Sequence, residues 1–507
     1  MADTKREIER KFEFTDAASA RRGVPDLTGT AAVAAVADRG TVELDAVYYD
    51  TPDQRLAADG LTLRRRTGGQ DAGWHLKLPV SPGVRDEVGA PLSDTPPGSL
   101  TALVRSRVRD TGLLPQVRLL SSRRVSHLLD ADGALLAELS TDEVRAERDD
   151  ATAAWTEVEV ELADGVDPRL LDAVEKTFRK AGLRVSASPS KLARALAETG
   201  PAPVGRTAPG PASDGTAGGY VLAYLREQRD ALVAQDPAVR RALPDSVHQM
   251  RVATRRLRSA FKTYRKVLDR AVTDPIGEDL RWLAAELGVD RDQEVLLERI
   301  RTSLDELPRT LLQGPVRSRL RTWNTARRSG SRRRALAALD SGRYVALLDS
   351  LDAVLDRPPL RKAADGAAER VLPKAVLADY ERLAGRVRDA LAMEPGHERD
   401  LALHDARKAA KRARYAAEAA VPALGKPAKR LAKAVKSVQT LLGDHQDGVV
   451  AREALHGLAL QASAAGESAF TWGVLYAREE ARAERCEREL PAVWKKASDP
   501  APRQALG

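Results

Sequence analysis

Three charged residues near the start of the chain have a spacing that suits metal and phosphate chemistry. Alternate residues of a strand lie on one face, so the segment EIERKFE places Glu7, Glu9 and Lys11 on the same side. Carboxylates are the ligands that Mg²⁺ and Mn²⁺ prefer, and lysine is a common partner of phosphate. The pattern favours a metal ion and a phosphate chain held by one strand face.

The same alternation recurs in three later segments, and each segment carries mainly one sign of charge. Arg64 and Arg66 share one strand face, His75 and Lys77 share another, and a third carries Glu157, Glu159 and Glu161. One interpretation is a solvent-exposed side of an antiparallel sheet. The other is a closed barrel with these faces inward, where a ligand must neutralise the charges because burying unpaired ions costs several kcal/mol each. Spacing alone leaves both open.

If hydrolysis occurs, we expect metal-assisted transfer of a phosphoryl group to water, with the cations stabilising charge on the phosphoryl oxygens. No side-chain nucleophile is needed. Lys11 would position the water, or deprotonate it if neighbouring cations lower the lysine pKa.

Two segments in the second half of the chain carry matching basic stripes. Each begins with a histidine and continues with cations 3, 7 and 10 residues later, which form one face of a helix. The stripes are His248, Arg251, Arg255 and Arg258, and then His404, Arg407, Lys411 and Arg414. Further candidate cations are Arg256 and Arg412 at offset 8, Lys408, and a second basic face of Lys429, Lys433 and Lys436.

A second repeated segment, the Leu-Gly echo, follows each stripe: LGVDRD begins at Leu287, and LGDHQD begins at Leu442. The order and spacing of both signals indicate an internal duplication of a helical unit. A single basic stripe is usually a solvated helix face, but two copies in register favour anion binding. Val289 and Asp290 differ from Asp444 and His445, so the copies are not equivalent.

The charge distribution also indicates an anionic partner for the second half. Residues 1–219 contain 29 Lys and Arg against 34 Asp and Glu, whereas residues 220–507 contain 53 against 39. Single-stranded nucleic-acid binders interleave aromatic residues for base stacking, yet only 4% of this chain is aromatic. Binding to a duplex backbone remains possible. A polymer made only of phosphate fits best, and nucleic acid is not the expected partner.

The elements that must position these residues fall into two kinds. Short alternating segments before residue 200 predict strands, with one helix near 168–182, and nearly everything after residue 219 predicts helices. Between them, GPAPVGRTAPGPASDGTAGG predicts a flexible linker. We therefore expect an α+β multidomain chain with three parts: a domain at 1–199, a linker at 200–219 and an all-α domain at 220–500.

The cysteine content and the hydropathy of the chain indicate its cellular compartment. The single cysteine, Cys486, excludes an internal disulfide and fits a reducing compartment. The charged N-terminal segment does not resemble a signal peptide, and no apolar run is long enough to span a membrane. We expect a cytoplasmic protein without a membrane partner.

The N-terminal landmarks resemble the CYTH (triphosphate tunnel metalloenzyme) family. ExExK is matched by Glu7, Glu9 and Lys11, followed by YYDTPDQRL, LRRR, LAELSTDEV, EVEVE and SKLARAL. The resemblance implies a closed antiparallel β tunnel that binds triphosphates with Mg²⁺ or Mn²⁺. It implies that Glu7, Glu9 and Lys11 are catalytic. The implied metal ligands are Glu7, Glu9, Glu157 and Glu159, with Asp142 or Glu161 assisting. The implied phosphate-binding residues are Lys11, Arg64, Arg66, Lys77, Lys191 and one of the pair Arg123 and Arg124.

The helical half resembles the CHAD family, on the HxxRxxxRRLR and HxxRKxxKRxRY segments and the two Leu-Gly echoes. This resemblance implies two pseudo-symmetric helical bundles with a basic surface that binds inorganic polyphosphate. The leading hypothesis is a polyphosphate-binding protein whose tunnel hydrolyses tripolyphosphate. The alternative is a non-catalytic scaffold on polyphosphate granules with the tunnel as a sensor. A third is adenylate cyclase or thiamine triphosphatase activity.

Overall fold

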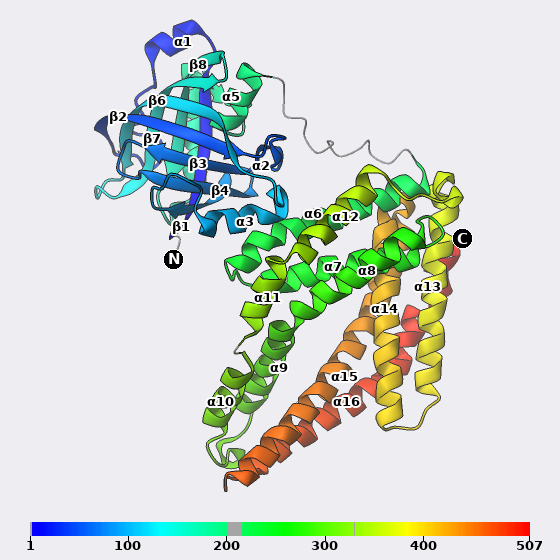
Figure 1. Cartoon of the computed structure of the whole chain (residues 1–507). Helices are drawn as coiled ribbons and strands as arrows, with labels where there is room; N and C mark the ends of the chain where they lie inside the picture. Colours follow the sequence, from blue (N-terminus) through cyan, green and yellow to red (C-terminus); the bar gives the residue numbers. More distant parts are fainter. Residues whose placement is uncertain (1–2, 201–214, 329, 507) are drawn as a thin grey trace. The chain divides into compact units, whose positions relative to one another are not determined.

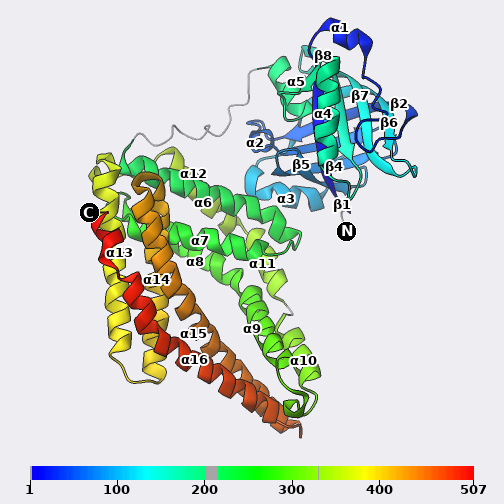
Figure 2. The same cartoon turned by 180° about the vertical axis from the view of Figure 1, so that it is seen from behind.

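The computed structural model divides into two compact units, Met1–Ala208 and Pro209–Gly507. It describes residues 3–200, 215–328 and 330–506. The first unit is built on strands and the second on helices (Figures 1 and 2). The expected antiparallel barrel followed by an all-α region is confirmed. Residues 201–214 of the predicted linker lie outside the described residues, and helix α6 begins at Ala217, three residues before the predicted boundary.

Eight antiparallel strands of the first unit close into a barrel. The strand order is β5-β4-β3-β2-β6-β7-β8-β1, and β1 also pairs with β5, which completes the ring. A short strand, β9, continues the sheet beside β1. The strands are Asp3–Phe14 (β1), Ala35–Asp50 (β2), Thr62–Thr67 (β3), Gly73–Ser81 (β4), Val84–Ala90 (β5), Leu114–Leu129 (β6), Leu135–Arg148 (β7), Ala151–Leu162 (β8) and Leu183–Val185 (β9).

Helix α4 (Arg169–Ala181) covers the outside of the barrel over β1 and β8 (Figure 2). The rings of Phe12 and Phe178 meet edge to face, with centroids 4.8 Å apart, and Val158 and Val160 are buried in the same cluster. Because the apolar residues of β1 and β8 face outward to α4, the alternate, charged residues must face the barrel interior.

Helix α5 (Lys191–Thr199) instead packs on inward-facing residues. Its buried side chains Leu192 and Leu196 belong to one cluster with Tyr48 and Trp155. The Ser190 hydroxyl accepts a hydrogen bond from the Ala193 amide at 3.0 Å, which caps the helix. The helix therefore fills one part of the barrel interior, and its first residue, Lys191, lies beside the charged strands.

Several elements of the first unit were not predicted from the sequence: β5, β9 and the helices α1 (Ala17–Arg22), α2 (Arg55–Ala58), α3 (Gly98–Val108) and α5. Helix α3 buries Leu100 and Val104 against Trp74 and Leu76 on the outward face of β4. The alternating segments predicted as strands at 41–51 and 121–129 cover only the later parts of β2 and β6, because the first halves of these strands lack a clear alternation.

The described residues of the second unit form two apolar cores. The larger one joins α6, α7, α8, α11, α12, α13, α14 and parts of α15 and α16, and the smaller one joins α9, α10 and the other parts of α15 and α16. Its helices are Ala217–Arg240 (α6), Ser246–Thr263 (α7), Arg270–Glu286 (α8), Gly288–Asp305 (α9), Val316–Arg328 (α10), Ser331–Leu339 (α11), Gly342–Asp356 (α12), Ala368–Leu391 (α13), His397–Leu424 (α14), Lys426–Ala464 (α15), Phe470–Ala497 (α16) and Pro500–Gln504 (α17), with short 3₁₀ turns at Arg309–Leu311 and Lys362–Asp365.

The duplication expected from the sequence is visible in the helices. Both α6 and α13 have 24 residues, and a β-bridge joins Thr216 to Ala367 directly before them. Each is followed by the helix that carries a basic stripe, α7 or α14. The copies differ at the second echo: α8 ends before Leu287 and α9 begins at Gly288, whereas α15 continues through Leu442. None of the described helices is long and apolar enough to cross a bilayer.

Candidate functional site

A cavity of about 410 Å³ lies inside the barrel of the first unit. Strand β1 contributes Glu7, Glu9 and Lys11 to its wall, which is the face predicted from alternation. Glu7 and Glu9 are buried. Other predicted residues line the same cavity: Arg64, Arg66, Lys77, Arg123, Glu159, Glu161 and Lys191. The charged faces therefore point inward, and the interpretation as a solvated sheet surface is wrong.

Cations from β3 and β4 line one side of the cavity. Lys77 Nζ lies 2.6 Å from Glu7 Oε2 and 3.2 Å from Glu87 Oε2. Arg64 lies 3.7 Å from Glu87. Burial disfavours the charge of Lys77, but Glu9 and Glu87 outweigh it and raise the lysine pKa. These side chains stay charged and are held in place by carboxylates.

Lys191 sits among three carboxylates from β7 and β8. Its Nζ lies 3.0 Å from Asp142, 2.7 Å from Glu157 and 2.7 Å from Glu159. The three acids each bring one oxygen within 4.8 Å of the others. Burial opposes the charge of Lys191, and the three acids raise its pKa. The lysine ammonium thus occupies the centre of a group that has the spacing of a metal site.

The neighbouring residues Arg123 and Arg124 point to opposite sides of β6. Arg123 donates to both oxygens of Asp142, at 2.7 and 2.8 Å, and to Glu159 at 3.0 Å. Arg124 donates to Asp38 on the outer surface at 2.7 Å, with 67% of its side chain exposed. Of the two arginines left open by the sequence, Arg123 therefore faces the cavity, and strand alternation turns Arg124 away from it.

The predicted acidic residues differ in their access to the cavity. Glu7, Glu9, Glu159 and Glu161 line it, whereas Asp142 and Glu157 do not. Glu157 accepts a hydrogen bond from Trp155 Nε1 at 2.7 Å. Glu161 pairs with Lys5, whose side chain is 59% exposed, at a mouth of the cavity.

Several wall residues were not assigned a role from the sequence, among them Tyr48 and Glu87, and His75 was placed on the strand face of Lys77 without a role. His75 Nδ1 lies 2.7 Å from Glu87 Oε1. Burial opposes ionisation of Tyr48, but Arg64 outweighs it and lowers the phenol pKa. The alternation in VRDEVGA, with Asp86 and Val88 on the other face, is the signal that could have found Glu87.

Two ionisable groups of the wall are shifted toward their neutral forms. Burial raises the pKa of Glu7; Lys77 opposes that shift and Glu87 adds to it. Burial lowers the pKa of Arg66, and Arg64 and Arg123 lower it further. An added cation would favour the charged form of Glu7, and an added anion would favour the charged form of Arg66.

The acidic side has the donor set of a hard divalent cation. Its candidate ligands Glu7, Glu9, Glu159 and Glu161 offer only carboxylate oxygens, which suit Mg²⁺ or Mn²⁺. Burial opposes the charge of Glu9 and Glu159, but Lys11 and other nearby cations outweigh it and lower the pKa of both, so these carboxylates are ionised and available as ligands. The residues present therefore fit such an ion.

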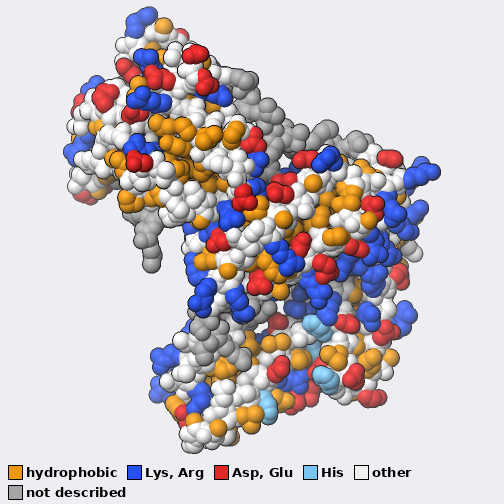
Figure 3. Space-filling model, viewed as in Figure 1, with side chains coloured by type: hydrophobic (Ala, Val, Ile, Leu, Met, Phe, Trp, Pro, Cys, Tyr) orange, Lys and Arg blue, Asp and Glu red, His pale blue; other side chains and the backbone are white. Residues whose placement is uncertain are grey.

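In the second unit, α7 and α14 pack together and bring the two basic stripes to one surface. The Tyr264 hydroxyl at the end of α7 donates to the Ala416 carbonyl of α14 at 3.0 Å. Burial lowers the pKa of Lys411 to about 8, and Arg407 and Arg255 add to the shift. The lowering effect of burial and of cations from both stripes therefore outweighs the raising effect of Asp447 on this pKa. Figure 3 shows Lys and Arg side chains gathered on the visible face of this unit, with histidines beside them.

The stripe residues are positioned by neighbouring elements. Arg251 donates to the Gly288 carbonyl at 3.3 Å, and Arg407 lies 3.7 Å from Asp447. His404 Nδ1 lies 2.5 Å from Gln446 Oε1. His248 and Arg258 are half-buried on α7. The side chains of Val289, Asp290 and Asp292 in the first echo lie outside the described residues.

Other predicted cations lie beside the stripes. Arg256 and Arg414 both reach Glu418, at 3.3 and 3.2 Å, and flank the Tyr415 ring. Arg412 bonds to Asp379 at 2.9 Å and to the Lys262 carbonyl at 2.8 Å, which ties α14 to α13 and α7. Lys408 is exposed and pairs with Asp405. The remaining lysines, Lys429, Lys433 and Lys436, are exposed on α15.

Comparisons with known proteins agree with this division of the chain. The CYTH domain model matches residues 5–196, and the CHAD domain model matches residues 223–456. Two sequences from Mycobacterium tuberculosis, "Uncharacterized protein MT2285" (strain CDC 1551 / Oshkosh) and "Uncharacterized protein Rv2226" (strain ATCC 25618 / H37Rv), are each 40% identical over 511 residues, covering 97% of this chain and 96% of the relative.

Two solved structures are similar to part of the chain. PptA from Streptomyces chartreusis shares 23% identity with a TM-score of 0.47, covering 55% of this chain and 99% of that one. The CHAD domain from the plant Ricinus communis shares 28% identity with a TM-score of 0.44, covering 56% and 92%. The two family models and the full-length mycobacterial relatives together show that this chain belongs to the family of proteins in which a CYTH domain is followed by a CHAD domain.

Proposed function

We propose that the tunnel of the first unit binds and hydrolyses inorganic tripolyphosphate with Mg²⁺ or Mn²⁺, and that the second unit binds inorganic polyphosphate. The presence of a CYTH and a CHAD domain supports a role with triphosphate or polyphosphate. The observation that carries the tunnel proposal is one cavity inside the closed barrel, lined by both cations (the cationic wall) and carboxylates (the acidic wall), several of which pair with each other.

The cationic wall fits a chain of phosphates. Arg64, Arg66 and Arg123 would direct guanidinium N–H groups at phosphate oxygens, and Lys77 would add a point charge. The ring side chains of the wall, Tyr48 and His75, already interact with Arg64 and Glu87. This favours an inorganic chain over a substrate whose base must stack on a ring.

The position of α5 supports a short substrate. Its residues Leu192 and Leu196 fill the barrel interior next to the cavity, together with Trp155. A long polymer threaded through the barrel would have to displace this apolar cluster. A short chain that enters from one end needs no such change.

The acidic wall would hold the divalent ion through Glu7, Glu9, Glu159 and Glu161. When bound, the ion would polarise a phosphoryl oxygen and make water a better nucleophile. Lys11 Nζ lies 3.4 Å from Glu9 Oε1 and also contacts Glu159. From there Lys11 would hold a terminal phosphate oxygen and orient the attacking water.

The second unit fits a longer anionic polymer. Arg255 of α7 and Arg407 and Lys411 of α14 form one basic surface whose like charges disfavour one another. A polyphosphate chain would neutralise them without needing an aromatic platform.

A phosphate-release assay tests the enzymatic proposal. The full chain should release phosphate from tripolyphosphate in the presence of Mg²⁺ or Mn²⁺, and EDTA should abolish the release. ATP and thiamine triphosphate serve as competing substrates. Absence of metal-dependent release from all three would contradict hydrolysis, and tripolyphosphate binding without turnover would favour a sensor or a granule scaffold.

A competition assay at matched salt tests the polymer proposal. Polyphosphate of increasing length should displace labelled polyphosphate from the full chain, whereas duplex DNA of equal charge should displace it poorly. Equal displacement by DNA would contradict recognition of a phosphate-only polymer. Association with polyphosphate granules should require Arg255 and Lys411.

A further inference from the structure

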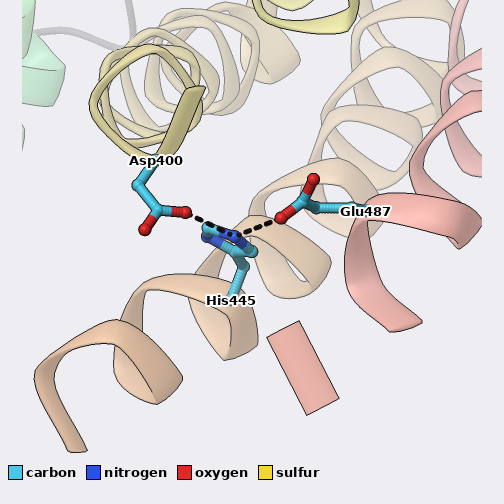
Figure 4. Close-up of side chains that lie close together, drawn as sticks. All are labelled: Asp400, His445 and Glu487. Atoms are coloured by element: carbon cyan, nitrogen blue, oxygen red, sulfur yellow. Dashed lines mark hydrogen bonds and ion pairs between the residues drawn. The ribbon is translucent and has the colours of Figure 1, made fainter. Parts of the chain in front are cut away.

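Three side chains from three helices converge inside the second unit, one of them a helical turn before the stripe of α14 begins (Figure 4). They are Asp400 of α14, His445 of α15 and Glu487 of α16. His445 Nε2 lies 3.3 Å from Asp400 Oδ1 and 3.4 Å from Glu487 Oε1. Only 1% of His445 is exposed. The proposal drawn from this cluster does not depend on the function proposed for the tunnel.

The two contacts are long for hydrogen bonds to a histidine. An N–H···O bond normally has a donor–acceptor distance of about 2.7–3.2 Å, and one imidazole nitrogen has a single hydrogen to share between two acceptors. The same two distances fit two edges of a coordination tetrahedron, and the ligand atoms of the three residues all lie within 4.8 Å of one another. With metal–ligand bonds of about 2.0–2.1 Å, neighbouring ligand atoms lie about 3.3–3.4 Å apart.

The outer oxygens of both carboxylates are already held by arginines. Arg452 lies 3.2 Å from Asp400 Oδ2, and Arg399 lies 3.1 Å from Glu487 Oε2. This leaves Asp400 Oδ1 and Glu487 Oε1 turned toward the histidine nitrogen. Partners behind the ligands are typical of metal centres, where they fix the orientation of the coordinating groups.

The cluster belongs to the second copy of the duplication only. His445 stands where the first copy has Asp290, and Asp400, four residues before His404, stands where the first copy has Pro244. Duplicated helices that needed this cluster only for packing would be expected to share it. Its presence in one copy indicates a task specific to α14, α15 and α16.

We propose that Asp400, His445 and Glu487 form a binding site for a divalent transition-metal ion, with Zn²⁺ as the best match. One imidazole and two carboxylates suit Zn²⁺ better than Mg²⁺, which prefers oxygen ligands alone. Water would complete the coordination shell, because the Asp400 and Glu487 side chains are 19% and 15% exposed. Arg452 and Arg399 reduce the negative electrostatic potential at the site, so its affinity for a metal ion is below that of the same ligands without these arginines.

The bound ion would link α14 to α15 and α16. Asp400 continues the stripe of α14 by one turn before His404. An ion at this position would fix the start of α14 and so hold the stripe cations in register. We therefore expect metal loading to raise the melting temperature of the second unit.

The test measures metal content of the full chain, not activity. Protein stripped with EDTA is equilibrated with Zn²⁺, desalted and analysed by mass spectrometry for bound equivalents. His445→Gln should bind one equivalent less than the wild type, and so should Asp400→Asn and Glu487→Gln. The matched control His404→Gln, which removes a histidine of the same helix bundle, should keep that equivalent.

Cobalt substitution separates this site from the tunnel. A nitrogen-ligated, tetrahedral Co²⁺ ion gives a visible absorption band that an all-oxygen octahedral site lacks almost entirely. Glu9→Gln should leave the band unchanged, and His445→Gln should remove it. If His445→Gln keeps both the bound equivalent and the band, the site does not exist, and a lower melting temperature alone would mean that His445 is only a structural ion-pair partner.

Discussion

Lys191 Nζ lies 2.7 Å from Glu159 Oε1, although Lys191 begins helix α5 and Glu159 lies in the middle of strand β8. The contact joins the last helix of the first unit to the acidic wall of the barrel. It depends on the Ser190 cap, which sets the residue at which α5 begins. Helix α5 thus brings Lys191, a cation of the cavity lining, into the barrel interior.

Replacing Lys191 with alanine should destabilise the first unit strongly. The change leaves the carboxylates of Asp142, Glu157 and Glu159 crowded in a buried position, and breaking a buried ion pair from one side costs about 3–5 kcal/mol. Differential scanning calorimetry of the full chain should show a barrel transition lowered by several degrees. The exposed Lys180 of α4 provides the matched control, and a Lys191→Ala transition equal to that of Lys180→Ala would contradict the account.

Polyphosphate binding should weaken above pH 8. The pKa of Lys411 is lowered to about 8 in the free protein, so the lysine is charged below that pH and neutral above it. A bound anion raises this pKa again, so binding takes up a proton and affinity falls by up to about tenfold between pH 8 and pH 9.

Lys411→Arg is the control for this pH dependence, because arginine stays charged throughout the range. Its affinity, measured by fluorescence anisotropy, should change little between pH 7 and pH 9. An equal slope for the wild type and Lys411→Arg would mean that Lys411 does not titrate in binding.

The double variant Arg255→Ala and Lys411→Ala should lose about 100-fold in affinity for polyphosphate. Each cation makes charge-assisted contacts worth about 1.5 kcal/mol or more, and 1.4 kcal/mol is a factor of ten. Arg370→Ala with Lys374→Ala removes the same charge from exposed positions on α13. If both double variants lose affinity equally, only net charge matters and the stripes are not the binding surface.

Much of the barrel site could be predicted because strand alternation is a strict rule. Glu7, Glu9 and Lys11 line the cavity as the parity of β1 requires, and Arg123 faces inward while Arg124 does not. Parity within β6 alone could not choose between the two arginines. The choice follows from the register of β6 with β7, where Arg123 stands opposite Asp142.

Contacts between elements distant in sequence could not be predicted. Glu87 lies on a strand whose alternation is short, and its role depends on the pairing of β5 with β4. Helix α5 was not predicted, so the place of Lys191 among three acids was not foreseen. In the second unit the stripe spacing predicted the helices well, but the tie of Arg412 to Asp379 follows from the packing of α13.

The comparison of Arg123→Ala with Arg124→Ala tests the central claim most directly. Titration calorimetry measures tripolyphosphate binding to the full chain without a divalent ion, so that turnover does not interfere. Arg123→Ala should weaken binding by about 100-fold, as expected for loss of one preorganised donor to a phosphate, and Arg124→Ala should bind like the wild type. Equal effects of the two substitutions, or no effect of Arg123→Ala, would contradict a phosphate chain held inside the barrel.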